Sequence, residues 1–342
     1  MKAVFLETHG GPEVLKYGNL PFHKPKANEI LVKIHAVALN HLDLWIRKGM
    51  PHLKHTYPLI LGSDIVGTVI DRGSEASEVA LEQKVLIHPA LSCGRCEACS
   101  SGWDNLCGQY KIFGEHVSGG YCEFISVPKQ NILPFPQKLS FAEAACIPLV
   151  FLTAWQMLVV RAKIKPGQVV VIHGAGSGVG SAGIQIAKLF GATVITTAGS
   201  DEKLQKAKEL GADYGINYQK ENFLERVGKI AGKYGVDVVF EHVGKAMWEA
   251  SLQCLKWGGV LVTCGATSGF DVKLDLRHVF FRQIQILGST MGSRANQFDI
   301  LKHIESGKLK PILDKTFPLE AAVEAHRYLE EFHQFGKVVL TI

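Results

Sequence analysis

The sequence predicts an α/β protein in which a β-rich first domain is followed by a doubly wound parallel sheet. Short apolar segments separated by turn residues fill the first part of the chain, and from Val169 to about Met291 strands alternate with helices. At 342 residues the chain is long enough for two domains. We place them at residues 1–150 and 151–292, and we expect residues 293–342 to complete the first domain.

The first domain contains four segments with the composition of strands, MKAVFL, LVKIHAVAL, LILGSDIVGTVID and KVLIHPAL. Turn signals separate them at Gly10–Gly11, Pro25–Asn28, Gly49–Pro51 and Gly73–Ser74. The pattern changes near Phe141, where SFAEAACIPLVFLTAWQML has a helical period. Ser140 and Glu143 have the spacing of a capping box at the start of this helix.

The second domain is organised around Val169–Gly180, VVVIHGAGSGVG, followed by a helix at Ser181–Phe190. A buried parallel strand is continuously apolar, so this segment predicts a strand, a tight turn and a helix. Small turn residues let the backbone approach the phosphates of a nucleotide, and the positive end of the helix attracts them. The loop is an imperfect G-x-G-x-x-G, with Ala175 and Ser177 at the first two glycine positions. A glycine-rich turn of another α/β protein is therefore the alternative.

Further strands are predicted at TVITTA, YGINY, VDVVFEHV, GVLVTCG and IQILGST. Between the first two of these, Gly199, Ser200 and Asp201 cap a helix that begins near Glu202. The tail has a helical run, AAVEAHRYLEEF, and ends in the strand VVLTI, which we expect to return to the first domain.

Composition excludes several classes of function. The formal net charge of +5 is spread along the chain, and no Lys/Arg cluster alternates with aromatic residues, so we expect no nucleic-acid partner. No apolar run approaches the ~20 residues of a membrane helix, and Met1–Phe5 opens a strand, not a signal peptide, so we expect no membrane partner. Isolated thiols at Cys122, Cys146, Cys254 and Cys264 favour a reducing compartment, and we expect a cytoplasmic protein.

The most specific chemical motif is CGRCEACSSGWDNLC, which contains Cys93, Cys96, Cys99 and Cys107. Three thiols at C-x2-C-x2-C spacing, with a fourth eight residues on, can close around one ion. Four thiolates suit tetrahedral zinc in a closed structural site, with an iron–sulfur cluster as the alternative. We expect one structural zinc per chain.

The chain resembles the medium-chain dehydrogenase/reductase superfamily of zinc-type alcohol dehydrogenases and quinone oxidoreductases. The resemblance runs from end to end, through MKAVFLETHGGPEVL, NHLDLWIRKG, LGSDIVGTV, the cysteine cluster, IPLVFLTAW, HGAGSGVG, TAGSDEKLQKAKELGAD, INY, ILGST and FGKVVL. It implies a GroES-like catalytic domain closed by the C-terminal segment, a Rossmann nucleotide-binding domain inserted between, and an active site in the cleft.

Zinc-dependent members of this superfamily hold a catalytic zinc with a Cys, a His–Glu pair and a third ligand. The resemblance places Asn40, Ser63 with Asp64, and Leu149 at these positions, and Leu42 where a proton-relay hydroxyl usually stands. Asn, Ser and Leu cannot supply the open zinc site, so we expect no catalytic zinc. The alternative is an unorthodox site built from His41, Asp43, Asp64, His88 and His116.

Asn40 is what the zinc-independent quinone and enone reductases of the superfamily carry. Their reaction is hydride transfer from reduced nicotinamide to an electron-poor carbon, while the protein positions the acceptor and stabilises charge on its oxygen. By this resemblance Asn40 contacts the nicotinamide ribose or the substrate oxygen, and Thr153 packs near the nicotinamide. We therefore assign the catalytic site to Asn40, Asp43, Ser63 and Thr153. The plainer interpretation of Asn40 and Asp43 is a turn and helix cap.

The cofactor's 2′ position is set by the end of the second strand, where an acidic residue selects NAD. Ala198, Gly199, Ser200 and the nearby Lys203 can accommodate a 2′-phosphate, so we expect NADP(H), with NAD(H) as the alternative because Asp201 and Glu202 lie close in sequence. The predicted cofactor-binding residues are Ser177, Gly178, Val179, Gly180, Gly199, Ser200, Lys203, Tyr218, His242, Cys264, Gly265, Gly288 and Ser289, the last two bordering the carboxamide.

These assignments predict an NADPH-dependent reductase of a quinone, an enone or another small carbonyl compound. The alternatives are a zinc-type alcohol dehydrogenase acting on small alcohols and aldehydes, and a redox-inert NADPH-binding scaffold. We also expect a homodimer or homotetramer, because VFFRQIQILGST has the composition of an apolar edge strand that solvent exposure would make prone to aggregation. Its apolar residues are Val279, Phe280, Phe281, Ile284 and Ile286.

Overall fold

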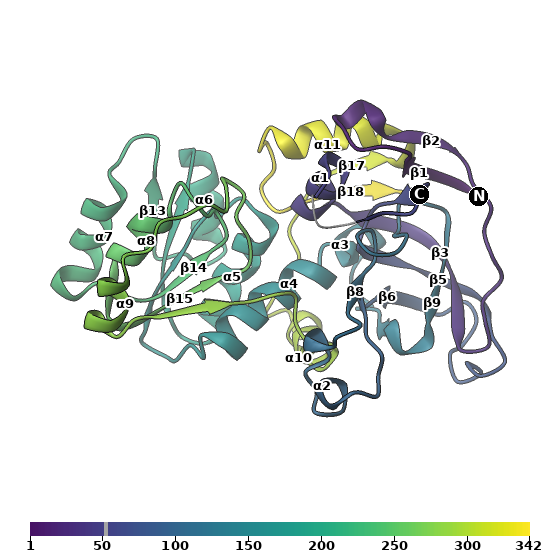
Figure 1. The fold of residues 1–342 in the computed structure, drawn as a ribbon, viewed down its shortest axis with the longest axis horizontal. Coiled ribbons are helices and arrows are strands. Elements are labelled where there is room, and N and C mark those ends of the chain that lie inside the picture. The colour runs from purple at the N-terminus through teal and green to yellow at the C-terminus, as the bar shows by residue number, and fades with distance from the viewer. Residues whose placement is uncertain (51–53) are drawn as a thin grey trace. The chain divides into compact units, whose positions relative to one another are not determined.

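The computed structural model describes residues 1–50 and 54–342, so Pro51, at the end of the turn predicted at 49–51, lies outside them. The chain divides into two compact units (Figure 1). Unit 1 comprises Met1–Leu149, Ser293–Gly307 and Pro311–Ile342, and unit 2 comprises Val150–Gly292 and Lys308–Lys310. The predicted α/β fold class is confirmed, since unit 1 is rich in strands and unit 2 contains a parallel sheet.

Unit 1 is built on two sheets. The larger has the order β10-β6-β5-β3-β18-β17, with β9 also pairing with β3, and the smaller has the order β2-β1-β4. The strands are β1 (Lys2–Leu6), β2 (Lys16–Asn19), β3 (Glu29–Ala38), β4 (Leu59–Ile60), β5 (Asp64–Arg72), β6 (Lys84–Ile87), β9 (Phe124–Pro128), β10 (Ile132–Pro134), β17 (Leu313–Pro318) and β18 (Lys337–Thr341). Because β18 pairs with β3, the prediction that VVLTI returns to the first domain is confirmed.

Helices and a two-stranded sheet complete unit 1. They are α1 (His41–Lys48), α2 (Glu97–Ser100), α3 (Phe141–Ala145), α10 (Arg294–Glu305), α11 (Ala322–Glu330) and the strand pair β7 (Ala90–Leu91) and β8 (Lys111–Ile112). The capping box at α3 is confirmed: the Ser140 backbone N–H donates to Glu143 Oε2 at 2.9 Å, and the Glu143 N–H donates to Ser140 Oγ at 3.3 Å.

The segment LILGSDIVGTVID, predicted as one strand, is two strands separated by a turn at Gly62. Gly62 has a φ of 95°, and a Cβ placed there would lie 2.5 Å from the Tyr121 ring. Only glycine fits this conformation and this close approach. The turn ends β4 and starts β5 at Asp64, so it sets the position of Ser63 and Asp64.

Unit 2 is a six-stranded parallel sheet of order β13-β12-β11-β14-β15-β16. Its strands are β11 (Val169–Ile172), β12 (Thr193–Ala198), β13 (Tyr214–Asn217), β14 (Val236–Glu241), β15 (Leu255–Thr263) and β16 (Gln285–Gly288), connected through helices α5 (Gly178–Leu189), α6 (Asp201–Glu209), α7 (Phe223–Ala231), α8 (Trp248–Gln253) and α9 (Leu276–Arg282). The order reverses between β11 and β14. Sheets of this kind bind ligands beyond the carboxyl ends of the strands at that reversal.

The expectation that no apolar run approaches the length of a membrane helix was wrong. Among residues 1–50 and 54–342 one helix, Phe141–Arg161, is long and apolar enough to cross a membrane by length and composition, with a mean hydropathy of 1.7. It contains α3, α4 (Pro148–Trp155) and the π-helical turn η4 (Gln156–Arg161). In the structure 78% of its most apolar window is buried, as in the core helix of a globular protein.

Candidate active site and metal centre

Three strand ends of unit 1 meet where the sequence placed the catalytic residues. Ala38, at the end of β3, pairs with Asp64 at the start of β5 and with Val339 near the start of β18. This register brings together the side chains of Asn40, Asp64 and Lys337. Their exposed fractions are 7%, 0% and 4%, so the group is buried.

The Asn40 side chain is held on both sides. Its Nδ2 donates to Asp64 Oδ2 at 2.9 Å, and its Oδ1 accepts from Lys337 Nζ at 2.6 Å. The same ammonium donates to Asp64 Oδ2 at 2.8 Å and to the Leu39 carbonyl at 2.6 Å. An ammonium only donates and a carboxylate only accepts, so these contacts fix the orientation of the amide. One Nδ2 hydrogen is left over for a further acceptor.

The other residues at positions where zinc-dependent members carry their ligands also hydrogen-bond within the protein. Asp64 Oδ1 accepts from the Leu149 backbone N–H at 2.6 Å, and the buried Ser63 hydroxyl donates to the Phe113 carbonyl at 2.7 Å. Leu149 contributes only its backbone to this group. The donor set of Asn40, Ser63 and Leu149 therefore does not fit a catalytic zinc.

Asp43 connects α1 to the Gly62 turn. Its Oδ2 accepts from the Asn40 N–H at 2.7 Å, which is the contact expected if Asn40 and Asp43 form a helix cap. Its Oδ1 accepts from the Gly62 N–H at 3.0 Å. Burial raises the pKa of Asp43 to about 6, although the two N–H donors and the Lys337 charge lower it in part. Asp43 therefore positions the Asn40 backbone, while Lys337 and Asp64 position its side chain.

A chain of buried polar groups ends at Asp43. Burial lowers the pKa of His326 to about 3, so its ring is neutral. Arg47 Nη1 lies 3.2 Å from His326 Nδ1 and can only donate, so the His326 Nε2 proton is donated to the Tyr121 hydroxyl at 3.2 Å. Burial and the Asp43 carboxylate, to which the hydroxyl hydrogen-bonds, raise the pKa of Tyr121. Arg47 also pairs with Glu330 at 2.7 Å.

The alternative metal ligands do not come together. His41 stacks on Phe332 with ring centroids 5.5 Å apart, and His88 is buried, with its pKa lowered to about 3 by burial. His116 Nδ1 accepts from the Ile112 N–H at 3.2 Å. Within residues 1–50 and 54–342, the cysteine cluster is the one group of three or more His, Cys, Asp or Glu side chains close enough together to hold an ion.

The four cysteines form a compact sulfur cluster. All four Sγ atoms lie within 4.8 Å of one another, with Cys96 Sγ and Cys99 Sγ 3.5 Å apart and Cys93 Sγ and Cys99 Sγ 3.9 Å apart. These distances are too long for disulfides. Sulfurs placed about 2.3 Å from a tetrahedral zinc stand about 3.8 Å apart, so the cluster fits that ion. Backbone N–H groups of Arg95 and Cys96 lower the pKa of the Cys93 thiol and favour the thiolate.

The loop that carries the cluster is docked onto α10. Asp104, in the 3-10 turn η2 (Asp104–Leu106) before Cys107, accepts from the Arg294 N–H at 3.0 Å. The Arg294 side chain donates to the Gln130 carbonyl at 2.6 Å. A metal held by Cys93, Cys96, Cys99 and Cys107 would thus fix a loop that is itself tied to the start of a helix.

In unit 2 the glycine-rich loop forms the predicted strand–turn–helix. Ser177 is the N-cap of α5, and its Oγ accepts from the Gly180 N–H at 2.9 Å. A Cβ at Gly180 would lie 2.3 Å from the Gly174 carbonyl oxygen, so the one glycine of the fingerprint that the sequence keeps is required by packing. The first-turn N–H groups at Gly178 and Val179 lie at the carboxyl end of β11. Free N–H groups at the start of a helix can bind a phosphate.

The end of β12 has the features predicted for a 2′-phosphate site. The Ser200 hydroxyl accepts from the Lys203 N–H at 3.3 Å, and it keeps its own hydrogen for a phosphate oxygen. A Cβ at Gly199 would lie 2.7 Å from the Tyr218 hydroxyl, so the exposed Tyr218 ring lies against the Gly199 backbone.

The nearby acid Asp201 is already paired. It accepts from Lys220 Nζ at 2.5 Å and from Asn217 Nδ2 at 2.6 Å, and these two contacts lower its pKa. Glu202 pairs with Lys206 at 2.8 Å. Both carboxylates thus face cations of the protein itself.

The other predicted cofactor residues lie at the carboxyl ends of β14, β15 and β16. After β14, His242 Nε2 donates to the His173 carbonyl at 2.8 Å. After β15, burial raises the pKa of Cys264 to about 12. At the end of β16, the Gly288 carbonyl accepts from the Arg161 side chain at 3.0 Å. The Gly265 carbonyl accepts from the Thr263 hydroxyl at 3.2 Å.

Two buried hydroxyls of unit 2 fit a bound nicotinamide. Thr153 Oγ1 and Ser289 Oγ have no hydrogen-bond partner among the described residues. Buried polar groups are normally paired, and a water molecule or a bound cofactor can supply the partner. The amide and ribose of a nicotinamide cofactor supply such partners.

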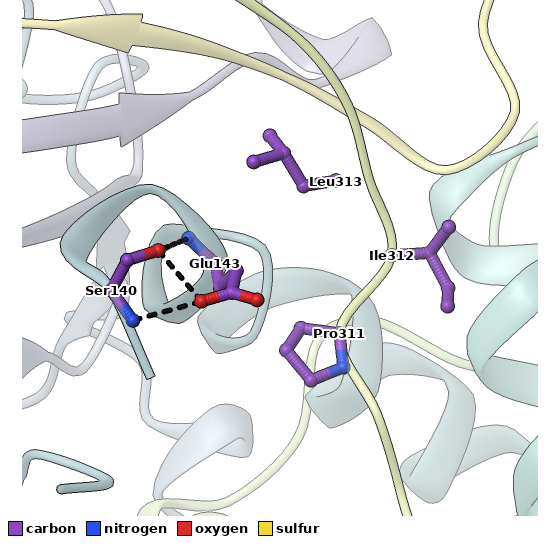
Figure 2. Close-up of a pocket in the computed structure, with 5 residues that line it drawn as sticks. All are labelled: Ser140, Glu143, Pro311, Ile312 and Leu313. Atoms are coloured by element: carbon purple, nitrogen blue, oxygen red, sulfur yellow. Dashed lines mark hydrogen bonds between the residues drawn. The ribbon is translucent and has the colours of Figure 1, made fainter. Parts of the chain in front are cut away.

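Figure 2 shows a pocket of unit 1 that is not the candidate site. Ser140, Glu143, Pro311, Ile312 and Leu313 line it. Its polar side chains bond each other, with Ser140 Oγ donating to Glu143 Oε2 at 2.7 Å, and none of the predicted site residues lies in it.

Sequence reasoning missed Lys337, although a lysine in the apolar strand segment FGKVVL was a visible signal. It also missed Arg47, Tyr121 and His326, whose side chains are fully buried. For these three, no spacing rule in the sequence indicated a contact.

The comparisons with known proteins cover the whole chain. The zinc-binding dehydrogenase profile matches residues 178–306, and the alcohol dehydrogenase GroES-like domain profile matches residues 26–137. An NAD-dependent alcohol dehydrogenase of Sulfolobus acidocaldarius is 33% identical over 352 residues, covering 100% of both chains, and the quinone oxidoreductase of Homo sapiens is 28% identical over 350 residues, covering 100% of this chain and 98% of that one.

Solved structures agree with this similarity. The crystal structure of an NAD-dependent alcohol dehydrogenase has a TM-score of 0.97 and 48% identity, with 100% of both chains covered. The crystal structure of AibC has a TM-score of 0.92 and 32% identity, covering 100% of this chain and 95% of that one.

Proposed function

Because the chain belongs to the medium-chain dehydrogenase/reductase superfamily, and is thus an NAD(P)(H)-dependent oxidoreductase, we propose that it is an NADPH-dependent reductase of a quinone, an enone or another small carbonyl compound. The observation that carries this proposal is the Asn40–Asp64–Lys337 group. This group lies at the position of the catalytic zinc site in zinc-dependent members. Its contacts fix the orientation of the Asn40 amide, which keeps one N–H for a further acceptor. An N–H donor of this kind can stabilise charge on a substrate oxygen or hold the nicotinamide ribose.

NADPH is favoured over NADH by the end of β12. Ala198 has no charge to repel a 2′-phosphate, the Ser200 hydroxyl and Lys203 can bind one, and the Asp201 carboxylate is paired with Lys220. Bound reduced nicotinamide supplies the hydride. The chain's own part is to hold the cofactor through the α5 N-terminus and the Thr153 and Ser289 hydroxyls.

Zinc in this proposal is structural and present once per chain, at the cysteine cluster. A complete shell of four thiolates leaves no position for a substrate, so this zinc stabilises the loop of residues 93–107, which contains α2 and η2. Eight free cysteines support a reducing compartment such as the cytoplasm.

The second candidate function is an alcohol dehydrogenase with a catalytic zinc. It is favoured by the names of the similar proteins, which include NAD-dependent alcohol dehydrogenases. Against it stand Asn40, Ser63 and Leu149, which are poor zinc ligands.

The test is a spectrophotometric screen of NADPH and NADH oxidation against quinones, enones, aldehydes and ketones, before and after extensive dialysis against a chelator. We expect NADPH oxidation with a quinone or an enone that survives dialysis. Oxidation of small alcohols by NAD, lost together with a second zinc, would move the function to alcohol dehydrogenase. Inactivity toward every acceptor alongside tight NADPH binding would favour the redox-inert scaffold.

We also propose a homodimer or a dimer of dimers formed through β16. In the described sheet β16 is an edge that pairs only with β15, and Phe280, Phe281 and Trp257 beside it are 68%, 65% and 63% exposed. Ile284 does not belong to this surface, because it is buried in the core of unit 2. Light scattering at micromolar concentration tests the proposal, and a monomer would contradict it.

A further inference from the structure

Glu241, the last residue of β14, is a fully buried acid that the sequence did not single out. Its Oε1 accepts from the Val243 N–H and from the Gly244 N–H, each at 2.8 Å, and Thr263 Oγ1 lies 3.5 Å from its Oε2. Burial raises the pKa of Glu241, although the two N–H donors lower it in part. This carboxyl fixes the backbone that follows the strand, because without it the two N–H groups lose their acceptor.

The backbone that Glu241 fixes carries His242, which lies against the glycine-rich turn. His242 Nε2 donates to the His173 carbonyl at 2.8 Å, and a Cβ at Gly174 would lie 3.0 Å from His242 Cε1. Gly174 has a φ of 63°, so glycine suits both this conformation and the close approach of the ring. The turn after β14 is therefore joined to the turn after β11, at the point where the order of strands reverses.

The turn after β14 is also joined to the turn after β15. The Val243 carbonyl accepts from the Ser268 N–H at 2.7 Å, and the Gly269 carbonyl accepts from the Lys245 N–H at 2.9 Å. A Cβ at Gly244 would lie 2.5 Å from the Gly269 carbonyl oxygen, so the two backbones are in close contact. The segment that the buried acid fixes thus lies between two other turns at the carboxyl edge of the sheet.

The strand order indicates which part of a dinucleotide lies over this segment. In a doubly wound sheet the diphosphate lies at the glycine-rich turn after the first strand, and the two nucleoside halves lie to either side of the reversal. Here β12 and β13 lie on one side of β11, and β14, β15 and β16 lie on the other. Since the 2′ position is expected at the end of β12, we expect the nicotinamide ribose over the turns after β14 and β15.

We propose that Glu241 is a positioning residue for the nicotinamide half of the cofactor. Through the Val243 and Gly244 N–H groups its carboxyl holds the turn after β14 in the conformation that places His242 on the glycine-rich turn. Glu241 has no exposed surface, so it acts through this turn and not by touching the cofactor. The adenosine half lies on the other side of the reversal and depends on it less. This inference rests on the proposed function, because it requires a nicotinamide dinucleotide on unit 2.

The test separates the two halves of the cofactor by truncating the ligand. Dissociation constants are measured for NADPH and for adenosine 2′,5′-bisphosphate, which lacks the nicotinamide and its ribose. Glu241→Leu has a similar size but accepts no hydrogen bond, so the turn is ordered in only a fraction of molecules and the apparent affinity falls by that fraction. We expect NADPH to bind about 10-fold or more weakly and the bisphosphate to change by less than about threefold. If the wild type prefers NADH, then NADH and AMP form the pair.

A conservative variant and a surface variant are the controls. In Glu241→Gln the amide oxygen can still accept from the two backbone N–H groups, and the amide nitrogen can donate to Thr263 Oγ1. We therefore expect this variant to regain the wild-type affinity for NADPH. Glu249→Leu changes an exposed glutamate of α8 and should alter neither dissociation constant.

Equal weakening of both ligands in Glu241→Leu would indicate general destabilisation and would overturn the proposal, as would an unchanged affinity for NADPH. If Glu241→Gln loses as much NADPH affinity as Glu241→Leu, then the charge matters and not the acceptor, which would also overturn it. If Glu241→Leu does not fold, Glu241→Asp replaces it, because the shorter side chain moves the carboxyl away from the N–H groups. It should weaken NADPH and not the bisphosphate, and the same two outcomes would overturn the proposal. A wild type that binds neither NADPH nor NADH would overturn the proposed function and this inference with it.

Discussion

The cysteine cluster and the Asn40–Asp64–Lys337 group are two polar clusters of unit 1 with opposite relations to a cation. In the first, four sulfurs lie within 4.8 Å of one another and could hold an ion. In the second, an ammonium of the protein is already bonded to a carboxylate, an amide oxygen and a backbone carbonyl. The residue types at a site decide which cation can balance it. In this chain a lysine balances the oxygen ligands, and four thiolates would suit a metal ion.

The largest effect should follow from removing the metal. We expect one zinc per chain in extensively dialysed protein, and we expect Cys96→Ser to lose it and to lower Tm more than any other single change discussed here. Structural zinc binding is worth about 10–16 kcal/mol in zinc-finger peptides and is coupled to folding. Metal analysis and thermal melts measure both quantities, and Cys254→Ser, at a thiol outside the cluster, should keep its zinc. Two zincs per chain would remove the contrast between the clusters.

The next largest effect should come from the lysine of the second cluster. Lys337→Met leaves the fully buried Asp64 carboxylate without its cation, and breaking a buried pair in this way costs about 3–5 kcal/mol of unfolding free energy. Urea unfolding should show this loss, and the double variant Lys337→Met/Asp64→Asn should recover part of it because no lone charge is left. Lys302→Met, at an exposed pair with Asp299, is the control and should change stability by less than about 1 kcal/mol. Equal losses at both lysines would mean that Lys337 is not a structural counterion.

The sequence predicted the first cluster and not the second for a physical reason. Thiols at C-x2-C-x2-C spacing are close in the chain, so spacing alone brings Cys93, Cys96 and Cys99 together. Lys337 is 273 residues from Asp64, and the two meet only through the pairing of β3 with β5 and β18. Local signals likewise predicted the Ser140–Glu143 capping box and the alternation of strands and helices in unit 2.

What local patterns could not predict was close approach between distant segments. LILGSDIVGTVID has the composition of one strand, but Gly62, with a φ of 95° and the Tyr121 ring packed against it, divides the segment into two strands. The segment VFFRQIQILGST has the composition of an exposed edge strand, but its Ile284 is buried in the core of unit 2.

Asp43, which accepts from the Asn40 backbone beside the second cluster, should make the stability of the protein depend on pH. Its folded pKa of about 6 exceeds the unfolded value of 3.8, so between these values the folded state binds the extra proton. Stability from this group is therefore present at low pH and is lost as pH rises from about 4 to about 6. Linkage puts the loss at up to about 3 kcal/mol. The difference in unfolding free energy between wild type and Asp43→Asn should shift by this amount over that range, and a difference independent of pH would contradict it.

The smallest expected effect concerns Asp201, a carboxylate of unit 2 that, like Asp64, is paired with a lysine. Since Lys220 pairs with Asp201, we expect Ala198 to be the residue that decides between NADPH and NADH. Ala198→Asp places an unpaired carboxylate at the end of β12, where it repels a 2′-phosphate and accepts from a 2′-hydroxyl. We expect NADPH to bind about 10- to 100-fold more weakly, equivalent to about 1.4–2.8 kcal/mol, and the preference to reverse toward NADH. Fluorescence titrations with both cofactors measure this, with Asp201→Asn as the control that should change either affinity by less than about threefold. If Asp201→Asn tightens NADPH binding as much as Ala198→Asp weakens it, then the Asp201 carboxylate faces the phosphate and its pairing with Lys220 does not neutralise it.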